Sequence, residues 1–336
     1  MVSLYIIQQL MCVIILFRLK TIYSILSLSL TFIIFNFKPD TYDIISYTKS
    51  VGNSHGFETL FHYLILTFSL ITNDSRLVVT YYQLLILCLS ASIILLFRNN
   101  RILILATIFS SVAVILATHN NLRQGTSSLL ILIGILLFLR GNIFLFLLPM
   151  FLSYGFHLSS VFFISCCLIT YLLYVFFLSK SQKKSDLNMH LIYISSFVIG
   201  LAFAFTFYLL SKLENIIYLN YVGLNLTIDN ERTPLDTKVI ALIVLSFTTE
   251  LFLRFSKVNY QVDYIRFLKL AFLFFIFFIS LNKDFDEIGA RISYFYYVIE
   301  MGLLCYLLDK KIYLPSVIII FFYAFAFNVW NILGGL

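Results

Sequence analysis

Charged residues are scarce in this chain of 336 residues, because Lys, Arg, Asp and Glu together make up only 12% of it. Soluble domains carry roughly a quarter. So few charges cannot cover the surface of a 39.0 kDa globule in which 61% of the residues are hydrophobic and the mean hydropathy is +0.98. We therefore exclude a soluble protein and predict a polytopic membrane protein.

Cysteine is also rare, with five residues, all within apolar runs: Cys12, Cys88, Cys166, Cys167 and Cys305. This placement argues against a disulfide framework, and the spacing fits no metal motif, so we expect no metal and no cofactor. The N-terminus lacks Lys and Arg before Arg18 and has no small-residue cleavage site. We expect a retained helix there.

Long apolar runs are abundant, and one of them covers residues 102–118. Their number predicts an all-α polytopic integral membrane protein with about 12 transmembrane helices. Segment 57–72 is short and contains Glu58 and His62, so we assign it as an interfacial or re-entrant helix. No internal repeat or soluble segment is evident. We predict a single transmembrane domain over residues 1–336.

Lys and Arg residues indicate the orientation of this domain. Twelve lie in loops that we assign to the cytoplasm: Arg98, Arg101, Arg140, Lys180, Lys183, Lys184, Arg254, Lys257, Arg266, Lys269, Lys310 and Lys311. Six lie on the opposite side: Arg123, Lys212, Arg232, Lys238, Lys283 and Arg291. The positive-inside rule then places loops 119–124, 211–236 and 282–289 on the outer face, and it also explains the net charge of +7 without a nucleic acid. The count is silent on residues 38–56.

Arg123 lies in a polar interruption, 119–125, between two apolar runs. Its charge is permanent, so it must meet water, a partner or an anionic ligand. Asn120, Asn121 and Gln124 beside it supply hydrogen-bonding groups that a lipid-headgroup anchor does not require. We therefore favour a ligand site at Arg123, with a snorkelling anchor as the alternative.

Two basic residues elsewhere suit the same chemistry. His157 lies in 153–160, where glycine and serines permit a broken helix, and it can act as a general base or simply hydrogen-bond inside a bundle. Arg291 opens a late helix after the acidic turn 284–287. It is either a salt-bridge partner of that turn or a second cation that joins Arg123 at a pyrophosphate.

Acidic residues complete the candidates. Asp40, Asp43 and Glu58 could bind sugar hydroxyls or supply a base, with solvated loops as the alternative. Glu300 falls near the middle of an apolar helix, where a carboxylate either has a function or locks the helix bundle through hydrogen bonds.

The order of these motifs resembles the EpsG family of bacterial polysaccharide polymerases and, beyond it, the Wzy O-antigen polymerases. The matching motifs extend over residues 38–308: the loop Asp40-x-x-Asp43, the segment Gly56-Phe57-Glu58, the helix start Asn121-x-Arg123-Gln124-Gly125, the break Phe156-His157-x-Ser159, and Arg291-x-x-Tyr294-Phe295. The sequence departs from the family pattern at Gly125-Thr126-Ser127-Ser128, where a more alanine-rich helix start is expected.

The resemblance implies a fold similar to GT-C-type glycosyltransferases, with loop 38–76 on the outer face. It implies an inverting polysaccharide polymerase in the bacterial cytoplasmic (inner) membrane, one that transfers a growing glycan from undecaprenyl pyrophosphate to a lipid-linked repeat unit. Arg123 and Arg291 would stabilise the pyrophosphate, and His157 would act as base or phosphate contact. Asp40 would be a further catalytic residue, and the expected substrate-binding residues are Asp43, Glu58, Asn120, Asn121, Gln124 and Tyr294.

The resemblance also implies other partners: membrane lipids and a chain-length-regulating membrane protein. Three other functions remain open. A flippase or transporter of about 12 helices predicts internal symmetry, which the sequence lacks. An O-antigen ligase shares the lipid-linked donor and differs only in its acceptor. A membrane-bound acyltransferase has only a lone histidine to support it.

Overall fold

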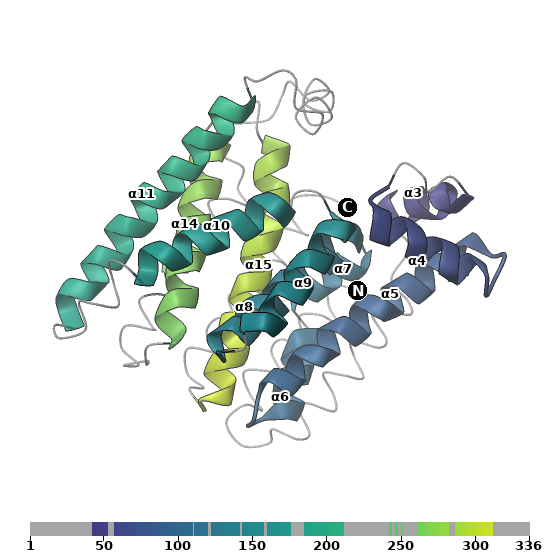
Figure 1. Cartoon of the computed structure of the whole chain (residues 1–336), viewed down its shortest axis with the longest axis horizontal. Helices are drawn as coiled ribbons and strands as arrows, with labels where there is room; N and C mark the ends of the chain where they lie inside the picture. Colours follow the sequence, from purple (N-terminus) through teal and green to yellow (C-terminus); the bar gives the residue numbers. More distant parts are fainter. Residues whose placement is uncertain are drawn as a thin grey trace, which may run out of the picture. The chain divides into compact units, whose positions relative to one another are not determined.

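The computed structural model describes residues 42–52, 57–109, 111–119, 122–141, 143–157, 160–175, 185–211, 242–243, 246–247, 250, 261–281 and 286–311. These residues form helices and connecting turns, with no β-strand among them, as the all-α prediction requires (Figure 1). The chain forms two compact units. The first comprises Met1–Ile164 and Met301–Leu336, and the second comprises Ser165–Glu300.

Most helices of the first unit follow one another along the chain. They are α3 (Tyr42–Ser50), α4 (Thr59–Ser69), α5 (Ser75–Ser92) with the 3-10 helix η2 (Ile93–Leu96), α6 (Arg101–Phe109), α7 (Val112–His119), α8 (Leu122–Leu139) and α9 (Ile143–Phe156). Helices α10 (Ser160–Leu173) and α15 (Asp286–Asp309) each contain a boundary between the two units.

Two described segments are long and apolar enough to cross a membrane, Ser75–Leu96 with 22 residues and Leu122–Leu139 with 18. Helix α4 has 11 residues, fewer than the roughly 20 that a span requires. Its location at the membrane interface therefore stays a prediction, as do the total of about 12 spans and the likeness to GT-C-type enzymes. The expected N-terminal and C-terminal helices lie outside the described residues.

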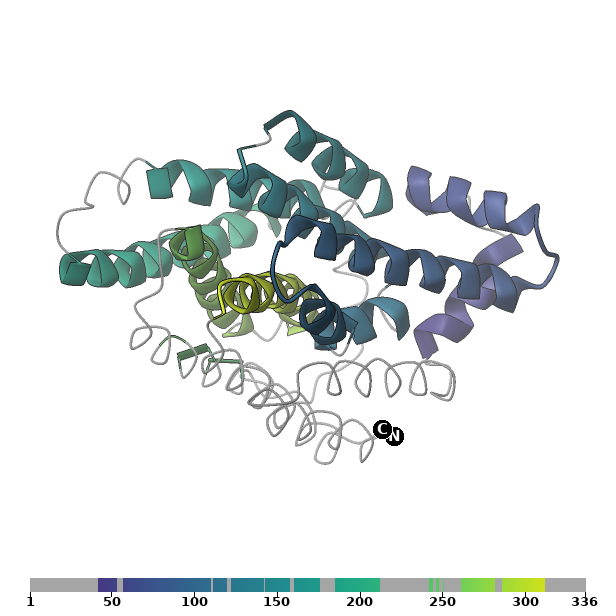
Figure 2. The same ribbon diagram turned by 90° about the horizontal axis from the view of Figure 1, so that it is seen from below.

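Helices α8 and α9 form a hairpin, in which they lie side by side (Figures 1 and 2). The connecting turn contains Gly141 at φ +82°, a conformation that residues with a Cβ rarely adopt. Gly134 lies at the contact between the two helices, because a Cβ there would meet the side chain of Met150. The chain therefore reverses sharply after α8 and returns α9 along it.

The sequence suggested one continuous helix for the apolar run 102–118, but the structure divides this run into two helices. Helix α6 ends at Phe109 and α7 begins at Val112. The hydroxyl of Ser111 donates to the carbonyl of Ile108 at 2.7 Å and accepts from the backbone N–H of Val114 at 3.3 Å. A serine that hydrogen-bonds to the backbone on both sides lets one helix stop and the next begin.

Asp309, at the end of α15, joins two of the positively charged loops assigned to one side of the membrane. Its carboxylate accepts the backbone N–H groups of Arg98 and Asn99 at 2.9 and 2.7 Å. The loop before α6 and the turn containing Lys310 are therefore adjacent, which agrees with the assignment of both to the same membrane face.

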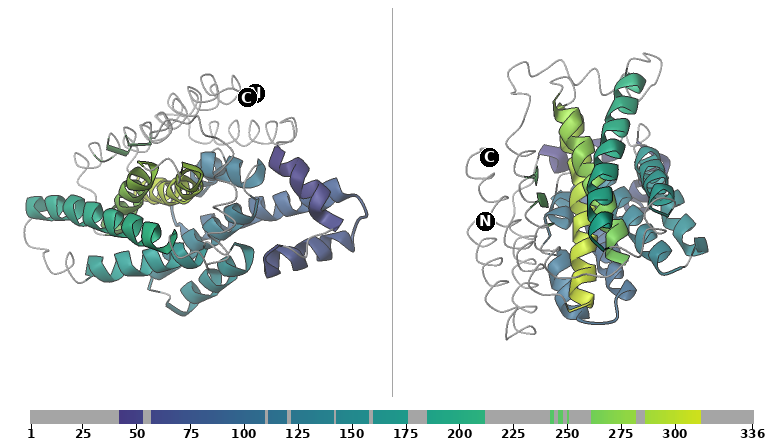
Figure 3. Two further views of the ribbon diagram at one scale, coloured as in Figure 1. Left: turned by 90° about the horizontal axis from the view of Figure 1, so that it is seen from above. Right: turned by 90° about the vertical axis from the view of Figure 1, so that its left-hand side faces the viewer.

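The second unit is built around α11 (Ser185–Ser211) and α14 (Gln261–Ser280), which lie side by side (Figure 3). At Gly200 the two helices approach closely, because a Cβ there would come within 2.9 Å of the backbone oxygen of Ala271 and also meet Phe274. Small residues at such crossings let helices pack tightly when apolar lipid tails surround them.

Candidate functional site

Arg123 lies in the first turn of α8, after α7 has ended at His119. Its Nη1 donates to the Oε2 of Glu58 at 2.5 Å, although 65 positions separate the two residues. About one fifth of each side chain is exposed, 21% for Arg123 and 20% for Glu58. Arg123, in the polar interruption predicted from the sequence, therefore belongs to an ion pair that solvent or a ligand can reach.

Aromatic rings surround the guanidinium of this pair. Its central carbon lies 4.7 Å from the ring centroid of Phe57, 5.8 Å from that of Phe61 and 5.9 Å from that of Tyr47. The Nε–H also donates to the hydroxyl of Tyr47 at 3.4 Å. We call Arg123, Glu58, Tyr47, Phe57 and Phe61 the arginine cage. Its rings hold the cation through cation–π attraction, so Arg123 makes more contacts than a snorkelling anchor needs.

The arginine cage rests on Tyr82 of α5, which is fully buried. The rings of Tyr82 and Phe61 lie 4.9 Å apart, edge to face. The hydroxyls of Tyr82 and Thr126 are 2.8 Å apart, and Thr126 also donates to the carbonyl of Leu122 at 2.9 Å. Thr126 has only one hydroxyl proton, so Tyr82 must be the donor in their mutual bond. The departure from alanine at Thr126 thus has a structural reason, since this hydroxyl joins α8 to α5.

His157 lies between helices α9 and α10, which end at Phe156 and begin at Ser160, as the predicted helix break requires. It is 9% exposed, and its backbone N–H donates to the carbonyl of Ser153 at 3.2 Å. The ring of the preceding Phe156 packs against Tyr82 at 6.4 Å between centroids. The histidine segment and the arginine cage therefore share one buried tyrosine.

The other predicted site residues belong to both units or lie outside the described residues. Gln124 is buried in α8, and Tyr294 is buried in α15 within the second unit. Asp43 and Arg291 belong to α3 and α15, but their side chains are outside the described parts, as are Asp40, Asn120 and Asn121 altogether. Arg291 and Arg123 belong to different units, and their convergence stays a prediction.

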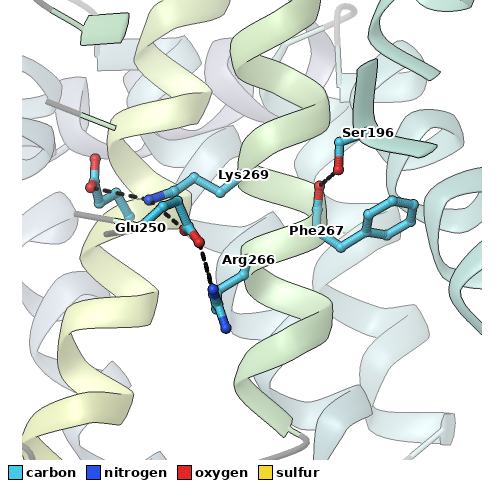
Figure 4. Close-up of polar contacts among 6 residues, drawn as sticks. Ser196, Glu250, Arg266, Phe267 and Lys269 are labelled. Carbon is cyan, nitrogen blue, oxygen red and sulfur yellow. Dashed lines mark hydrogen bonds and ion pairs between the residues drawn. The ribbon is translucent and has the colours of Figure 1, made fainter. Parts of the chain in front are cut away.

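A buried quartet of charged residues, Glu250, Arg266, Lys269 and Glu300, occupies the interior of the second unit (Figure 4). The Oε2 of Glu250 accepts from the Nη2 and Nε of Arg266 at 2.7 and 3.0 Å. The Nζ of Lys269 lies 3.2 Å from the Oε1 of Glu250 and 3.7 Å from the Oε1 of Glu300. With all four groups ionised the cluster is neutral, and no side chain in it is more than 4% exposed.

The quartet changes which positive residues can be assigned to the cytoplasmic side. The prediction that Arg266 and Lys269 are cytoplasmic loop residues is wrong, because both lie within α14 and are buried. Without them, ten positive residues remain on the inner side against six, so the bias keeps its direction. Sequence reasoning also missed Glu250. The available signal was the presence of charges inside apolar helices, which need partners there.

The two clusters differ in what they can do. The quartet is sealed from solvent and its charges balance, so it suits a structural role. The arginine cage is partly exposed and presents a permanent cation, so it suits binding of an anionic ligand. No group of three His, Cys, Asp or Glu side chains with metal-binding geometry occurs in the described parts of the chain.

Comparison with known proteins identifies the family. No curated protein and no solved structure matches the chain significantly. A model of the EpsG family matches residues 20–334, nearly the whole chain. Together with the apolar helices, this match indicates a membrane protein of polysaccharide biosynthesis with glycosyltransferase-like polymerase function. The motifs around Glu58, Arg123 and His157 thus occur in a chain that belongs to the EpsG family.

Proposed function

We propose that this protein polymerises an O-antigen or related surface polysaccharide at the outer face of the bacterial cytoplasmic membrane. It would transfer a growing glycan from undecaprenyl pyrophosphate to the non-reducing end of a lipid-linked repeat unit. The observation that carries this proposal is the reachable cation of Arg123, held among three aromatic rings at the start of α8. Family membership supplies the reaction class.

The chemistry requires what the arginine cage offers. In an inverting transfer, the acceptor hydroxyl attacks the anomeric carbon while the bond from that carbon to the pyrophosphate oxygen breaks. Negative charge therefore grows on the leaving group, and a guanidinium held in place stabilises it without reorganisation. Arg291 would supply a second cation, and Tyr294 with the amides of Asn120, Asn121 and Gln124 would bind substrate.

The acceptor hydroxyl also needs a proton acceptor. His157 is one candidate, since the ring of the preceding Phe156 packs against Tyr82, which supports the arginine cage. Glu58 is already in the cage, and Asp40 and Asp43 precede it in the sequence. The donor and acceptor are both lipid-linked, so the protein would take them from the membrane. A chain-length-regulating membrane protein would act as a further partner.

Complementation of a deletion strain tests the assignment, with the ladder of surface polysaccharide on a gel as readout. We expect Arg123→Ala to leave single repeat units, and Arg123→Lys to be nearly as poor because an ammonium cannot make a two-pronged contact. Arg140→Ala is the matched control, since this exposed arginine follows the other end of α8 and should support normal ladders. Long chains from a stably expressed Arg123→Ala variant would refute the proposal.

The deletion strain itself separates the other functions. Single repeat units on the surface indicate a polymerase. Free polymer that is not attached to its lipid A acceptor indicates a ligase, and repeat units retained on the cytoplasmic face indicate a flippase.

A further inference from the structure

Glu58 makes an unusual contact for a residue at a helix start. It is the N-cap residue of α4, yet its side chain makes no capping hydrogen bond. Its Oε2 is instead held by the Nη1 of Arg123. Capping of α4 therefore does not account for the carboxylate at position 58. Its contact is the ion pair with Arg123.

Arg123 has N–H donors that no described residue occupies. A guanidinium has five N–H donors. Within the described parts of the chain, Arg123 uses Nε for Tyr47 and Nη1 for Glu58. The pair is about one fifth exposed, whereas the charges of the buried quartet are at most 4% exposed. An anion can thus approach Arg123 in a way that it cannot approach Arg266 or Lys269.

We propose that Glu58 occupies the donor's phosphate position on Arg123, is displaced when the pyrophosphate binds, and then acts as the general base for the acceptor hydroxyl. This inference rests on the proposed polymerase function. A pyrophosphate carries more negative charge than one carboxylate and can engage two guanidinium nitrogens at once, so it displaces Glu58 from Nη1. The rings of Phe57 and Phe61 stay against the cation because Phe61, on α4, packs on Tyr82 and Phe57 packs on Phe61.

Displacement changes what Glu58 can do. While Oε2 accepts the N–H of Arg123, one of the two carboxylate oxygens is occupied and the side chain is held against the guanidinium. After displacement, the carboxylate takes the proton of the acceptor hydroxyl, whose oxygen forms the new bond to the anomeric carbon. The old bond from that carbon breaks, and its electron pair leaves with the pyrophosphate on Arg123. Binding of the donor thus frees the whole carboxylate to turn to the acceptor hydroxyl.

Binding of inorganic pyrophosphate to the purified full-length protein in detergent, measured by titration calorimetry, tests the first half. Glu58→Gln removes the competing charge and nearly preserves the shape of the side chain. We expect it to bind pyrophosphate about tenfold tighter than the wild type, since a charged hydrogen bond no longer has to be displaced. Arg123→Ala should abolish binding, and Arg140→Ala should leave it unchanged.

The polysaccharide ladder tests the second half. Glu58→Gln should lose long chains despite its tighter binding, whereas Glu58→Asp, which keeps a carboxylate, should restore part of the ladder. Equal or weaker pyrophosphate binding by Glu58→Gln, or normal ladders from it, overturns the inference. If Arg123→Ala still abolishes binding and polymer in that case, only the role of Glu58 falls. If neither wild type nor Glu58→Gln binds pyrophosphate and Arg123→Ala makes long chains, the proposed function falls as well.

Discussion

Replacing Lys269 by methionine removes the cation that lies between two buried carboxylates, Glu250 and Glu300. Methionine has a similar length and no charge, so the variant tests charge rather than volume. Glu250 keeps both hydrogen bonds from Arg266. Glu300 loses the cation at 3.7 Å, its ion-pair partner within the described part of the second unit.

The expected cost follows from these distances. At an effective dielectric constant of about 20, the attractions at 3.2 and 3.7 Å amount to about 5 and about 4.5 kcal/mol before desolvation is counted. The variant no longer has to bury an ammonium group, and this saved desolvation offsets part of the lost attraction. Removing one partner of a buried pair typically costs about 3–5 kcal/mol. Because proteins are stable by only about 5–15 kcal/mol, Lys269→Met should fold poorly.

Thermal unfolding in detergent, monitored by size-exclusion chromatography, measures the change in stability. The double variant Lys269→Met with Glu300→Gln removes one charge of each sign and leaves the Glu250–Arg266 pair intact. We expect it to recover most of the lost stability, to within about 1–2 kcal/mol of the wild type. The reasoning is refuted if the single variant melts like the wild type, or if adding Glu300→Gln makes it less stable still.

Two further substitutions test packing and the arginine cage. Gly200→Ala should lower the stability by about 1–3 kcal/mol in the same unfolding assay, because the added methyl collides with Phe274 and with the backbone of α14, whereas Gly52→Ala meets nothing within 4 Å and should be neutral. An unchanged melting temperature for Gly200→Ala would contradict the close helix approach. Phe57→Leu should weaken pyrophosphate binding by about two- to fivefold, since it removes the ring nearest to the guanidinium of Arg123. Full affinity in this variant would show that the ring of Phe57 fills space but makes no cation–π contribution to binding.

The sequence alone determined which residues deserved attention at the site. Arg123 stood out because a permanent charge beside an apolar run needs a partner. The break at His157 was visible because glycine and serine interrupt a helix pattern there, and α9 indeed ends at Phe156. Apolar composition likewise predicted the helical fold and the membrane class. These features are local, and each can be recognised from a few neighbouring residues.

Only the tertiary structure decided which charged residues form ion pairs with one another. Glu58 and Arg123 were each noted separately, but 65 positions separate them, and no spacing rule joins residues on different helices. The same limit led Arg266 and Lys269 to be counted as loop charges, because their partner Glu250 lies 16 positions from Arg266 on another segment. Sequence patterns show how a residue differs from its neighbours along the chain. Only packing determines which distant charge meets it, and therefore whether that charge is sealed in a core or open to a ligand.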